Sequence, residues 1–321
     1  MSSESILLVA IMAHNEERVV SKAINSCLNQ IPPFQFGVRV LVVANGCTDR
    51  TEEIVADIAR QSPTRLLLMS MKEKGKTKAL NNVITYVKEE IDKEANIPYV
   101  IFLDADCEFV GDNTFIKFVK RFEETPLLCA VGANCIPNTS DASRTNLVSD
   151  MYRALNELSR LLPENGISGG AYCIKSNILR KLSFPEFQMA DDMYVSLKLD
   201  GWMFRDQGIN VVYAIPGDLR GELTKRVRQE IATQRYFEYH RYLLETGRQT
   251  ALFDTALDYE YRWLGFSNSN VFRNWYSMKN TKFKLLIALN VLIRFSAKIL
   301  AYWKIRKLRR NPELDFWRVE R

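Results

Sequence analysis

The sequence predicts an α/β protein built on a doubly wound, mostly parallel sheet that is flanked by helices. Apolar runs of strand length alternate with helical patterns through the first third of the chain. These runs are apolar throughout, as in strands that are covered on both faces. The chain has 321 residues, of which 47% are hydrophobic and 26% charged, so it can bury a large core. Strands that alternate with helices are joined by right-handed crossovers and therefore run parallel.

Four strands are expected before residue 110, and each ends at a polar turn. Helical patterns follow the first three strands and end near Leu28, Arg60 and Glu90. The expected strands cover residues 6–12, 38–44, 66–71 and 100–103. The carboxyl ends of parallel strands lie at one edge of a sheet, where open α/β sheets bind ligands. The loops after these strands should therefore face one crevice.

The fourth run leads directly into Asp104-Ala105-Asp106, the most informative motif of the chain. Two carboxylates one residue apart repel each other unless a positive charge lies between them. Mg²⁺ is commonly held by one or two carboxylates, while substrate phosphates and water supply its other ligands. The pair therefore predicts a site for a divalent cation, Mg²⁺ or Mn²⁺, and a diphosphate. The alternative is a solvated loop, as in most Asp-x-Asp triplets.

The other three loops carry residues that suit a nucleotide. Asn45 could bind a base or ribose, or could cap the turn that follows it. Lys76 opens a helix after Gly75, so it could contact phosphate or base, or could be plain surface charge. Glu16 could accept hydrogen bonds from ribose hydroxyls, or could complement a helix dipole. Together these residues describe a nucleotide-diphosphate pocket.

The cysteines and the first residues indicate a reducing compartment. The six cysteines have neither Cys-x-x-Cys spacing nor a compact framework, and there are only two histidines. This argues against a zinc site and favours reduced thiols in a cytoplasmic protein. The first four residues offer neither the charged nor the apolar region of a secretory signal, so none is expected.

These motifs, in this order, resemble the family 2 glycosyltransferases, an inverting, metal-dependent class with the GT-A fold that uses nucleotide sugars. Residues 13–17, Ala-His-Asn-Glu-Glu, resemble the family's opening Ala-Tyr-Asn-Glu-Glu. Gly75-Lys76 and Ala79-Leu80-Asn81 resemble its Gly-Lys-x-x-Ala-Leu-Asn segment, and Asp104-Ala105-Asp106 resembles its metal-binding triplet. The resemblance covers roughly residues 6 to 240.

The resemblance implies a nucleotide-sugar donor, with a UDP-sugar favoured, and a metal held by Asp106 and Asp104. The donor would be contacted by Ala13, Asn15, Glu16, Asn45, Lys76, Asp104, Ala105 and Asp106. The chain departs from the family at Ala44-Asn45, where the family usually has two aspartates. This departure removes the carboxylates that would recognise the base, and Asn45 could take their place.

The acceptor half is expected after residue 130. Gly169 and Gly170 lie in a small-residue segment that resembles the acceptor end of the family's site, where glycines let the backbone approach a sugar. An ordinary tight turn is the alternative. Asp191 and Asp192 precede a helix expected from Met193, and could be helix caps. By resemblance, Asp192 is the base that deprotonates the acceptor hydroxyl and Asp191 is its neighbour.

A helix expected at 224–241 carries Gln234-Arg235-Tyr236. This segment weakly resembles a Gln-x-x-Arg-Trp motif that holds the diphosphate and stacks on the acceptor sugar. Arg235 would neutralise the leaving group, and Tyr236 or Phe237 would be the platform; a place in the core is expected for Phe237. Because the motif is weakened, single transfer is favoured over polymerisation.

The C-terminal helix, expected at 282–309, is apolar with a basic end, and much of the net charge of +6 lies there. Its uninterrupted apolar stretch, 285–293, is too short to span a hydrocarbon layer of about 30 Å. The helix could lie in a membrane interface. Alternatively, it could pack on the catalytic domain or on another subunit.

The expected domains are a catalytic domain at 1–240, with a nucleotide-binding half at 1–130 and an acceptor half at 131–240, and a helical extension at 241–321. The predicted activity is the inverting transfer of a hexosyl or N-acetylhexosaminyl group to a sugar or lipid-linked acceptor, in glycan, polysaccharide or glycolipid biosynthesis. The predicted place is the cytoplasm or the cytoplasmic face of a membrane, without nucleic-acid partners. A non-catalytic relative that binds a nucleotide sugar, or a scaffold, is the alternative. A nucleotidyltransferase is disfavoured because the first loop lacks a glycine-rich, Arg-containing segment.

Overall fold

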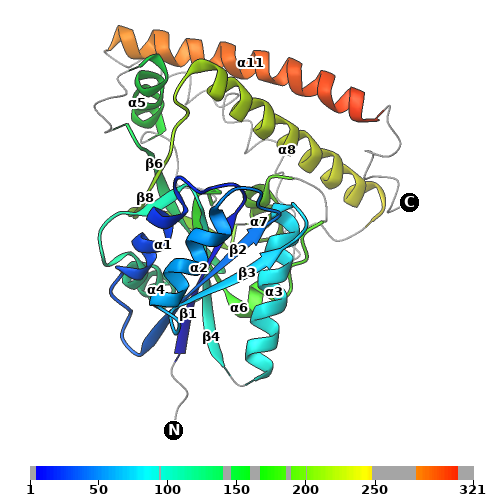
Figure 1. Ribbon diagram of the computed structural model, residues 1–321. Helices are drawn as coiled ribbons and strands as arrows, with labels where there is room; N and C mark the ends of the chain where they lie inside the picture. Colours follow the sequence, from blue (N-terminus) through cyan, green and yellow to red (C-terminus); the bar gives the residue numbers. More distant parts are fainter. Residues whose placement is uncertain are drawn as a thin grey trace. The chain divides into compact units, whose positions relative to one another are not determined.

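The computed structural model describes residues 5–93, 95–139, 146–159, 167–185, 189–199, 201–247 and 280–309. The described residues form two compact units (Figure 1). The first unit contains the described residues up to 136 and those at 167–213, and the second contains those at 137–159, 214–247 and 280–309. The first unit is a sheet with its covering helices, and the second is helical.

The first unit is built on an eight-stranded sheet with the strand order β3-β2-β1-β4-β7-β6-β8-β5. Its strands are β1 (Ser5–Ala13), β2 (Phe36–Asn45), β3 (Leu66–Met71), β4 (Asn96–Asp104), β5 (Cys107–Phe109), β6 (Ala130–Pro137), β7 (Ala171–Lys175) and β8 (Met203–Tyr213). Its helices are α1 (Val20–Leu28), α2 (Thr51–Gln61), α3 (Lys76–Asp92), α4 (Thr114–Glu124), α6 (Ser176–Leu179) and α7 (Asp191–Leu199). The predicted α/β fold with its four leading strands is confirmed.

The first four strands are parallel, because β1 pairs with β2 and β4, and β2 pairs with β3. All of β1 from Leu7 to Ala13 is buried. Successive residues of a strand point to opposite faces, and Leu7, Val9 and Ile11 join one hydrophobic core with residues of α1, α2 and α4. Helix α3, whose buried residues are not part of that core, contacts β1, β2 and β4. The strands are therefore apolar on both faces.

Helix α4 shows how strongly these helices are held. Phe115, Phe118, Val119 and Phe122 are all buried, and each lies three or four residues from others of the set, as on one face of a helix. Three of them belong to the same core as β1. Full burial of one such side chain is worth about 1.5–3 kcal/mol. The stripe of aromatic residues therefore attaches α4 firmly to the sheet.

The other half of the sheet is antiparallel. Strand β7 pairs antiparallel with β4 and with β6, and β5 pairs antiparallel with β8. Strand β5 begins at Cys107, directly after Asp106. The chain therefore passes from the centre of the sheet to its edge strand immediately after the acidic motif. The mixed character of the sheet comes from this half, which lies outside the four expected parallel strands.

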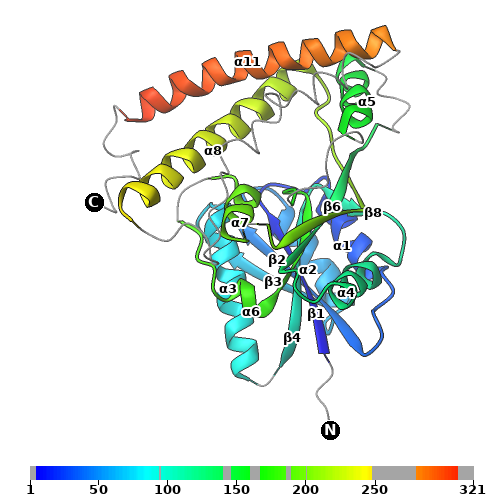
Figure 2. The same ribbon diagram turned by 180° about the vertical axis from the view of Figure 1, so that it is seen from behind.

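The second unit contains α5 (Leu147–Ser159), α8 (Leu219–Glu245) and α11 (Thr281–Arg309). Helices α8 and α11 lie side by side in both views (Figures 1 and 2), and each contacts α5. The predicted C-terminal helix is confirmed, and the helix predicted at 224–241 is longer at both ends. Its first turn is capped by Asp218, which accepts a hydrogen bond from the Gly221 N–H at 2.7 Å.

A buried polar cluster joins these three helices. Glu222 is fully buried, and its carboxylate accepts hydrogen bonds from Arg226 Nε at 2.6 Å and from the Tyr152 hydroxyl at 2.9 Å. Arg294 of α11 lies close enough for Arg226 to affect it: burial, and then the charge of Arg226, lowers the pKa of Arg294 to about 10. Asn290, one turn earlier, is also fully buried. The packed side of α11 is therefore partly polar.

The opposite side of α11 is apolar. Leu285, Leu292, Phe295, Ile299 and Trp303 recur along the helix, and between 45% and 68% of each is exposed. Within the described part of the chain, residues 281–306 are long and apolar enough to cross a membrane, by length and composition only, with a mean hydropathy of 1.7 over 18 residues. This span is longer than the uninterrupted apolar stretch at 285–293 because it extends past Arg294 and Lys298. We define the five residues named here as the outer face of α11.

The division into two units differs from the boundary at residue 240 that we expected. Helices α5 and α8 group with α11, because the buried cluster around Glu222 and the packing of Met151 and Ala154 on Leu286 join these helices. The six cysteines are all free.

Candidate functional site

The carboxyl ends of the four parallel strands lie in register at one edge of the sheet. Ala13 pairs with Ala44, Asn45 with Met71, and Met12 with Asp104. Each strand ends in one of the loops singled out in the sequence. The loops therefore come together because parallel strands of similar register end together. Residues from the antiparallel half complete the arrangement.

The loops after β1 and β2 hold each other. Asn15 has a left-handed backbone, with φ +58°, and its side chain accepts a hydrogen bond from the Thr48 N–H at 2.8 Å. The Glu16 N–H donates to Thr51 Oγ1 at 2.8 Å. Asn tolerates the left-handed region better than other non-glycine residues. The predicted donor-site residues Asn15 and Glu16 thus lie in a loop whose conformation is set by the loop after β2.

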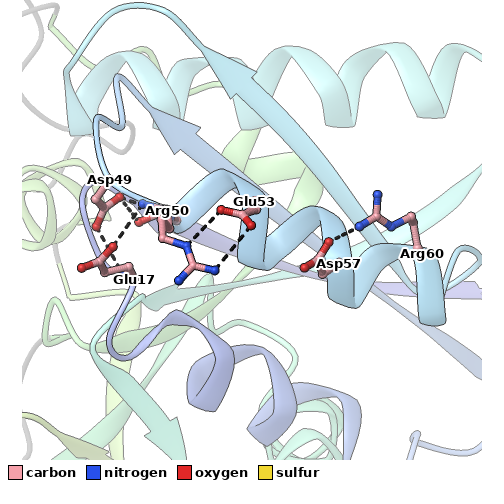
Figure 3. Close-up of polar contacts among 7 residues, drawn as sticks. Glu17, Asp49, Arg50, Glu53, Asp57 and Arg60 are labelled. Atoms are coloured by element: carbon pink, nitrogen blue, oxygen red, sulfur yellow. Dashed lines mark hydrogen bonds and ion pairs between the residues drawn. The ribbon is translucent and has the colours of Figure 1, made fainter.

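Figure 3 shows a second set of bonds between these two loops. The Glu17 N–H donates to Asp49 Oδ2 at 3.1 Å, and the Arg50 N–H donates to Glu17 Oε2 at 3.2 Å. Arg50 also pairs with Glu53 on the exposed side of α2, at 3.0 Å. Exposed ion pairs of this kind contribute little stability. The two hydrogen bonds from backbone N–H groups, in contrast, hold the loop after β1 against the residues that lead into α2.

Asn45 is buried and connects three loops. Its Nδ2 donates to the carbonyl of Ala13 at 2.8 Å, and its Oδ1 accepts from the Gly75 N–H at 3.2 Å. Next to it, Gly46 has φ +61°, and a Cβ there would lie 2.8 Å from the Lys74 nitrogen. Both the nitrogen and the oxygen of the Asn45 amide therefore make hydrogen bonds within the protein, and these bonds connect the end of β1 to the loop before α3. Its contact with a nucleotide stays a prediction.

Lys76, the first residue of α3, lies between two carboxylates that come from different elements. Its Nζ is 2.7 Å from Asp104 Oδ1, at the end of β4, and 3.0 Å from Asp191 Oδ1, at the start of α7. About a third of the Lys76 side chain is exposed, whereas 9% of the Asp191 side chain is. The structure thus brings Lys76, from the predicted diphosphate site, into contact with Asp191, the neighbour of the predicted general base Asp192.

The charges of this group oppose one another. Burial raises the pKa of Asp104 to about 7; Lys76 opposes this rise, and the neighbouring carboxylates of Asp106 and Asp191 add to it. Burial disfavours the charged form of Lys76, but Asp104 and Asp191 outweigh burial and raise its pKa well above the usual value. Lys76 is therefore a fixed cation, and the acidic residues around it make a strong site for positive charge.

The second carboxylate of the motif, Asp106, has a different setting. Ala105 is buried, so the two aspartates project from a turn whose middle residue is anchored. The Cys107 thiol lies 3.7 Å from Asp106 Oδ1, a weak donor at that distance. In the described residues, no group of three or more His, Cys, Asp or Glu side chains could hold a metal. Two carboxylates alone fit a hard divalent cation that takes its remaining ligands from substrate phosphates and water.

Asp192 is held in place by two backbone N–H groups. Gly169 donates to Asp192 Oδ2 at 3.1 Å and Met193 donates to Oδ1 at 2.9 Å. Burial raises the pKa of Asp192 to about 6, and the charge of Asp191 adds to the rise while Lys76 opposes it. A carboxylate with this pKa is largely deprotonated at neutral pH and can still accept a proton, which suits a general base.

Neighbouring side chains lie close to the two glycines before β7, Gly169 and Gly170. A Cβ on Gly170 would lie 2.6 Å from Cys135 Sγ, a separation that real contacts do not reach. A Cβ on Gly169 would meet Asp192 Oδ2 at 3.4 Å. The carbonyl of Gly170 accepts a hydrogen bond from the Asp104 N–H at 3.0 Å. The segment thus bridges Asp104 and Asp192. Direct contact of these glycines with an acceptor sugar stays a prediction.

Tyr172 is a site residue that the sequence analysis did not single out. Its side chain is buried against Phe102, with ring centroids 5.1 Å apart, and its hydroxyl has no hydrogen-bond partner among the described residues. Burial raises the pKa of Tyr172 well above its usual value, and the charge of Asp191 adds to this. A buried hydroxyl without a partner is costly and uncommon. The only sequence signal was its position two residues after Gly170.

Helix α3 contacts the segment before Asp191 at a second point. Asn81 Nδ2 donates to the carbonyl of Phe184 at 2.8 Å, and Asn81 Oδ1 accepts from the Phe184 N–H at 2.8 Å. The Phe184 ring is buried and lies 5.0 Å from the ring of Tyr194 in α7. The helix that carries Lys76 is thereby tied to the segment that leads into α7.

Replacing Asn81 with Ala should lower the free energy of unfolding by about 1–3 kcal/mol, because both backbone groups of Phe184 lose their partner. Asn82→Ala is the matched control: it makes the same change on the same helix, and no side-chain hydrogen bond of Asn82 is found among the described residues. Urea denaturation of both variants measures the difference. Equal losses in the two variants would contradict the role given to Asn81.

Gln234, Arg235 and Tyr236 lie on α8, in the second unit. Tyr236 is buried, with its ring 5.3 Å from that of Phe237 and stacked on His240 at 6.2 Å. Phe237, for which a place in the core was expected, is half-buried. The roles of these residues toward a diphosphate or an acceptor stay predictions.

The chain is similar in sequence to known glycosyltransferases. The model of the glycosyl transferase family 2 matches residues 8–182. An uncharacterized glycosyltransferase of Escherichia coli (strain K12), YaiP, is 25% identical over 213 residues, which are 63% of this chain and 50% of that protein. The match thus spans about half the length of that relative.

Among solved structures, the chain is similar to the mannosyltransferase PcManGT of Pyrobaculum calidifontis, solved in complex with GDP-Man and Mn²⁺, with a TM-score of 0.59 and 19% identity over 94% of this chain and 87% of that one. TarS of S. aureus matches with a TM-score of 0.46 and 17% identity, over 71% of this chain and 39% of that one. The first of these likenesses supports a GT-A fold.

Proposed function

Because the chain belongs to the glycosyl transferase family 2, we propose that it transfers a sugar from a nucleoside-diphosphate donor to an acceptor hydroxyl with inversion. One observation carries the proposal: Lys76 pairs with Asp104 and with Asp191, next to Asp192, at the carboxyl edge of the parallel strands. A cationic and acidic group at that edge suits a donor diphosphate. A base beside the same group suits attack by a hydroxyl.

On the donor side, Lys76, Asp104 and Asp106 are the residues proposed to receive the diphosphate. Asp106, with Asp104, would hold a divalent cation, which would offset the negative charge of the diphosphate as it departs. Lys76 supplies a permanent positive charge in the same place. Preorganised charges that face a developing anion are a large part of enzymatic rate enhancement. The loop of Asn15 and Glu16 is proposed to receive the nucleoside.

On the acceptor side, Asp192 takes the proton of the attacking hydroxyl. The hydroxyl oxygen bonds to the anomeric carbon as the bond from that carbon to the diphosphate breaks, and the nucleoside diphosphate leaves with the bonding electrons. Direct displacement of this kind inverts the anomeric centre. The N–H groups of Gly169 and Met193 keep the Asp192 carboxylate in place. Such positioning is a requirement of general-base catalysis.

The donor is proposed to be a nucleoside-diphosphate hexose or N-acetylhexosamine. The family resemblance favours a UDP-sugar, whereas the similar mannosyltransferase was solved with GDP-Man. The replacement of the family's acidic pair by Ala44-Asn45 leaves the base open to test. The acceptor is proposed to be a sugar or a lipid-linked sugar in glycan, polysaccharide or glycolipid synthesis.

The test is a donor panel. The full chain is incubated with Mn²⁺ or Mg²⁺ and UDP- and GDP-linked sugars, and release of nucleoside diphosphate is measured. At least slow release from one donor is expected, and EDTA should suppress it. If no donor is turned over and no nucleotide binds in the presence of metal, the proposal that the chain is an enzyme fails, and the result favours the scaffold alternative.

We further propose that the outer face of α11 contacts a membrane. Large exposed apolar patches mark interaction surfaces, and Lys282, Lys298 and Arg306 lie on exposed positions of the same helix, which suits anionic headgroups. The partner helix α8 carries many charged residues, so the pair suits a position in the interface more than a span across the bilayer.

Replacing Leu292 and Phe295 together with Gln should reduce the fraction of protein that sediments with vesicles of phosphatidylglycerol and phosphatidylcholine by about tenfold or more. Both side chains are 63% exposed, so the fold should be kept. Phe34→Gln, at an 88% exposed phenylalanine of the first unit, is the control and should leave binding unchanged. Equal binding by all three proteins would contradict the membrane contact.

A further inference from the structure

Lys76 makes the contact that a metal ion would make at Asp104. Its ammonium is 2.7 Å from Asp104 Oδ1, which is the carboxylate predicted to share a divalent cation with Asp106. An ammonium and a divalent cation on one carboxylate repel each other strongly in a partly buried site. Lys76 must therefore release Asp104, or the cation must bind with much lower affinity.

The second contact of Lys76 offers a place for the released ammonium. Asp191 Oδ1 is 3.0 Å from Lys76 Nζ, and Asp191 belongs to the start of α7, not to the acidic motif. Its side chain is more deeply buried than that of Asp104, at 9% against 31% exposed. The more deeply buried carboxylate is less screened by water and salt, so it should hold the Lys76 ammonium more firmly than Asp104 does.

We propose that Lys76 is an internal counter-ion that competes with the divalent cation for Asp104, and that Asp191 retains Lys76 when the cation binds. Asp191 is then a positioning residue that acts through Lys76. The inference rests on the proposed metal site at Asp104 and Asp106. It gives the lysine that opens α3 a role at the proposed metal site. It also connects the donor side to α7, which carries Asp192.

The test is a titration of the metal-free full chain with Mn²⁺ alone, followed by the electron paramagnetic resonance signal of free Mn²⁺. Lys76→Gln should bind Mn²⁺ about tenfold or more tightly than the unaltered chain, because a unit positive charge beside the ion is removed. Asp191→Asn should bind more weakly, because Lys76 then stays on Asp104. The double variant should bind like Lys76→Gln.

Lys78→Gln is the matched control: it removes a charge from the same turn of α3, where Lys78 pairs with Glu73. It should change the affinity by no more than about twofold. Asp106→Asn should lose the binding, which places the ion at the motif. If Asp191→Asn does not fold, the comparison of Lys76→Gln with Lys78→Gln still decides the competition.

Unchanged or weaker binding by Lys76→Gln would overturn the competition. A double variant that binds more weakly than Lys76→Gln would mean that Asp191 acts on the ion directly, and this would overturn its positioning role. Either result would leave the metal site itself in place. If no variant binds Mn²⁺, with or without a nucleoside diphosphate, the metal site and the inference fail together.

Discussion

Replacing Asp192 with Asn should lower kcat/KM by about 10²–10⁴-fold, the range that general-base catalysis contributes. Asn has nearly the same size and can still accept the hydrogen bond from the Gly169 N–H, while the bond from the Met193 N–H is lost at a cost of about 1 kcal/mol, so the fold around it should be kept. It cannot take a proton from the acceptor hydroxyl. The loss should appear in kcat more than in the affinity for the donor, which we expect to bind chiefly through Lys76 and Asp106.

The pH profile gives the same prediction a second readout. Burial, together with the charge of Asp191, raises the pKa of Asp192 to about 6, so the base form is lost as the pH falls through that value. The unaltered chain should therefore lose activity below about pH 6, and the residual activity of Asp192→Asn should lack this limb. Asp57→Asn, a matched change on the exposed side of α2 (Figure 3), should keep both the rate and the limb. An Asp192→Asn enzyme with near-normal rate would exclude Asp192 as the base.

Replacing Asp106 with Asn should be the second most damaging change, with a loss of about two to three orders of magnitude in kcat/KM. The side chain removed is the carboxylate that Lys76 does not occupy, and it is therefore the one proposed to be free for the cation. Calorimetry should show that Mn²⁺ no longer strengthens the binding of the nucleoside diphosphate.

The control for Asp106 is Asp112→Asn, which makes the same change at an exposed position shortly after β5. It should behave as the unaltered chain does in both measurements. Metal-dependent nucleotide binding that survives in Asp106→Asn would mean that the acidic motif does not hold the ion. A compensating gain of affinity for Mg²⁺ over Mn²⁺ is not expected, because both ions prefer carboxylate oxygen.

The part of the fold that could be predicted is the part with a strong local signal. Strand β3 begins and ends where the apolar run does, and β1, β2 and β4 extend the predicted runs by only a few residues. A continuous apolar run has one interpretation when polar turns and helical patterns flank it. The parallel arrangement then follows from the connections, and so does the meeting of the four loops at one edge.

The antiparallel half could not be predicted in the same way. Strand β5 has three residues, and β8 mixes buried and half-buried residues without a regular alternation. Their places in the sheet depend on partners that are distant in sequence, Val211 to Tyr213 for β5. Local patterns do not record such pairings.

The candidate site shows the same limit. The motifs predicted which loops would meet, but not that Lys76 would join Asp104 to Asp191 or that Asn81 would hold the backbone of Phe184. Those contacts depend on how α3 lies against α7 and its preceding segment. Tyr172 was missed for a related reason, since an aromatic residue in a strand is usually core and only its unpaired hydroxyl marks it.

The anomeric configuration of the first product tests the central claim most directly. With a donor from the panel that is turned over, proton NMR at early times should show a sugar product of the opposite configuration to the donor, before the free sugar equilibrates. The Asp192→Asn variant should produce it at a rate lower by about 10²-fold or more. A first product with the donor's own configuration, or an unchanged rate in Asp192→Asn, would contradict direct displacement with Asp192 as the base.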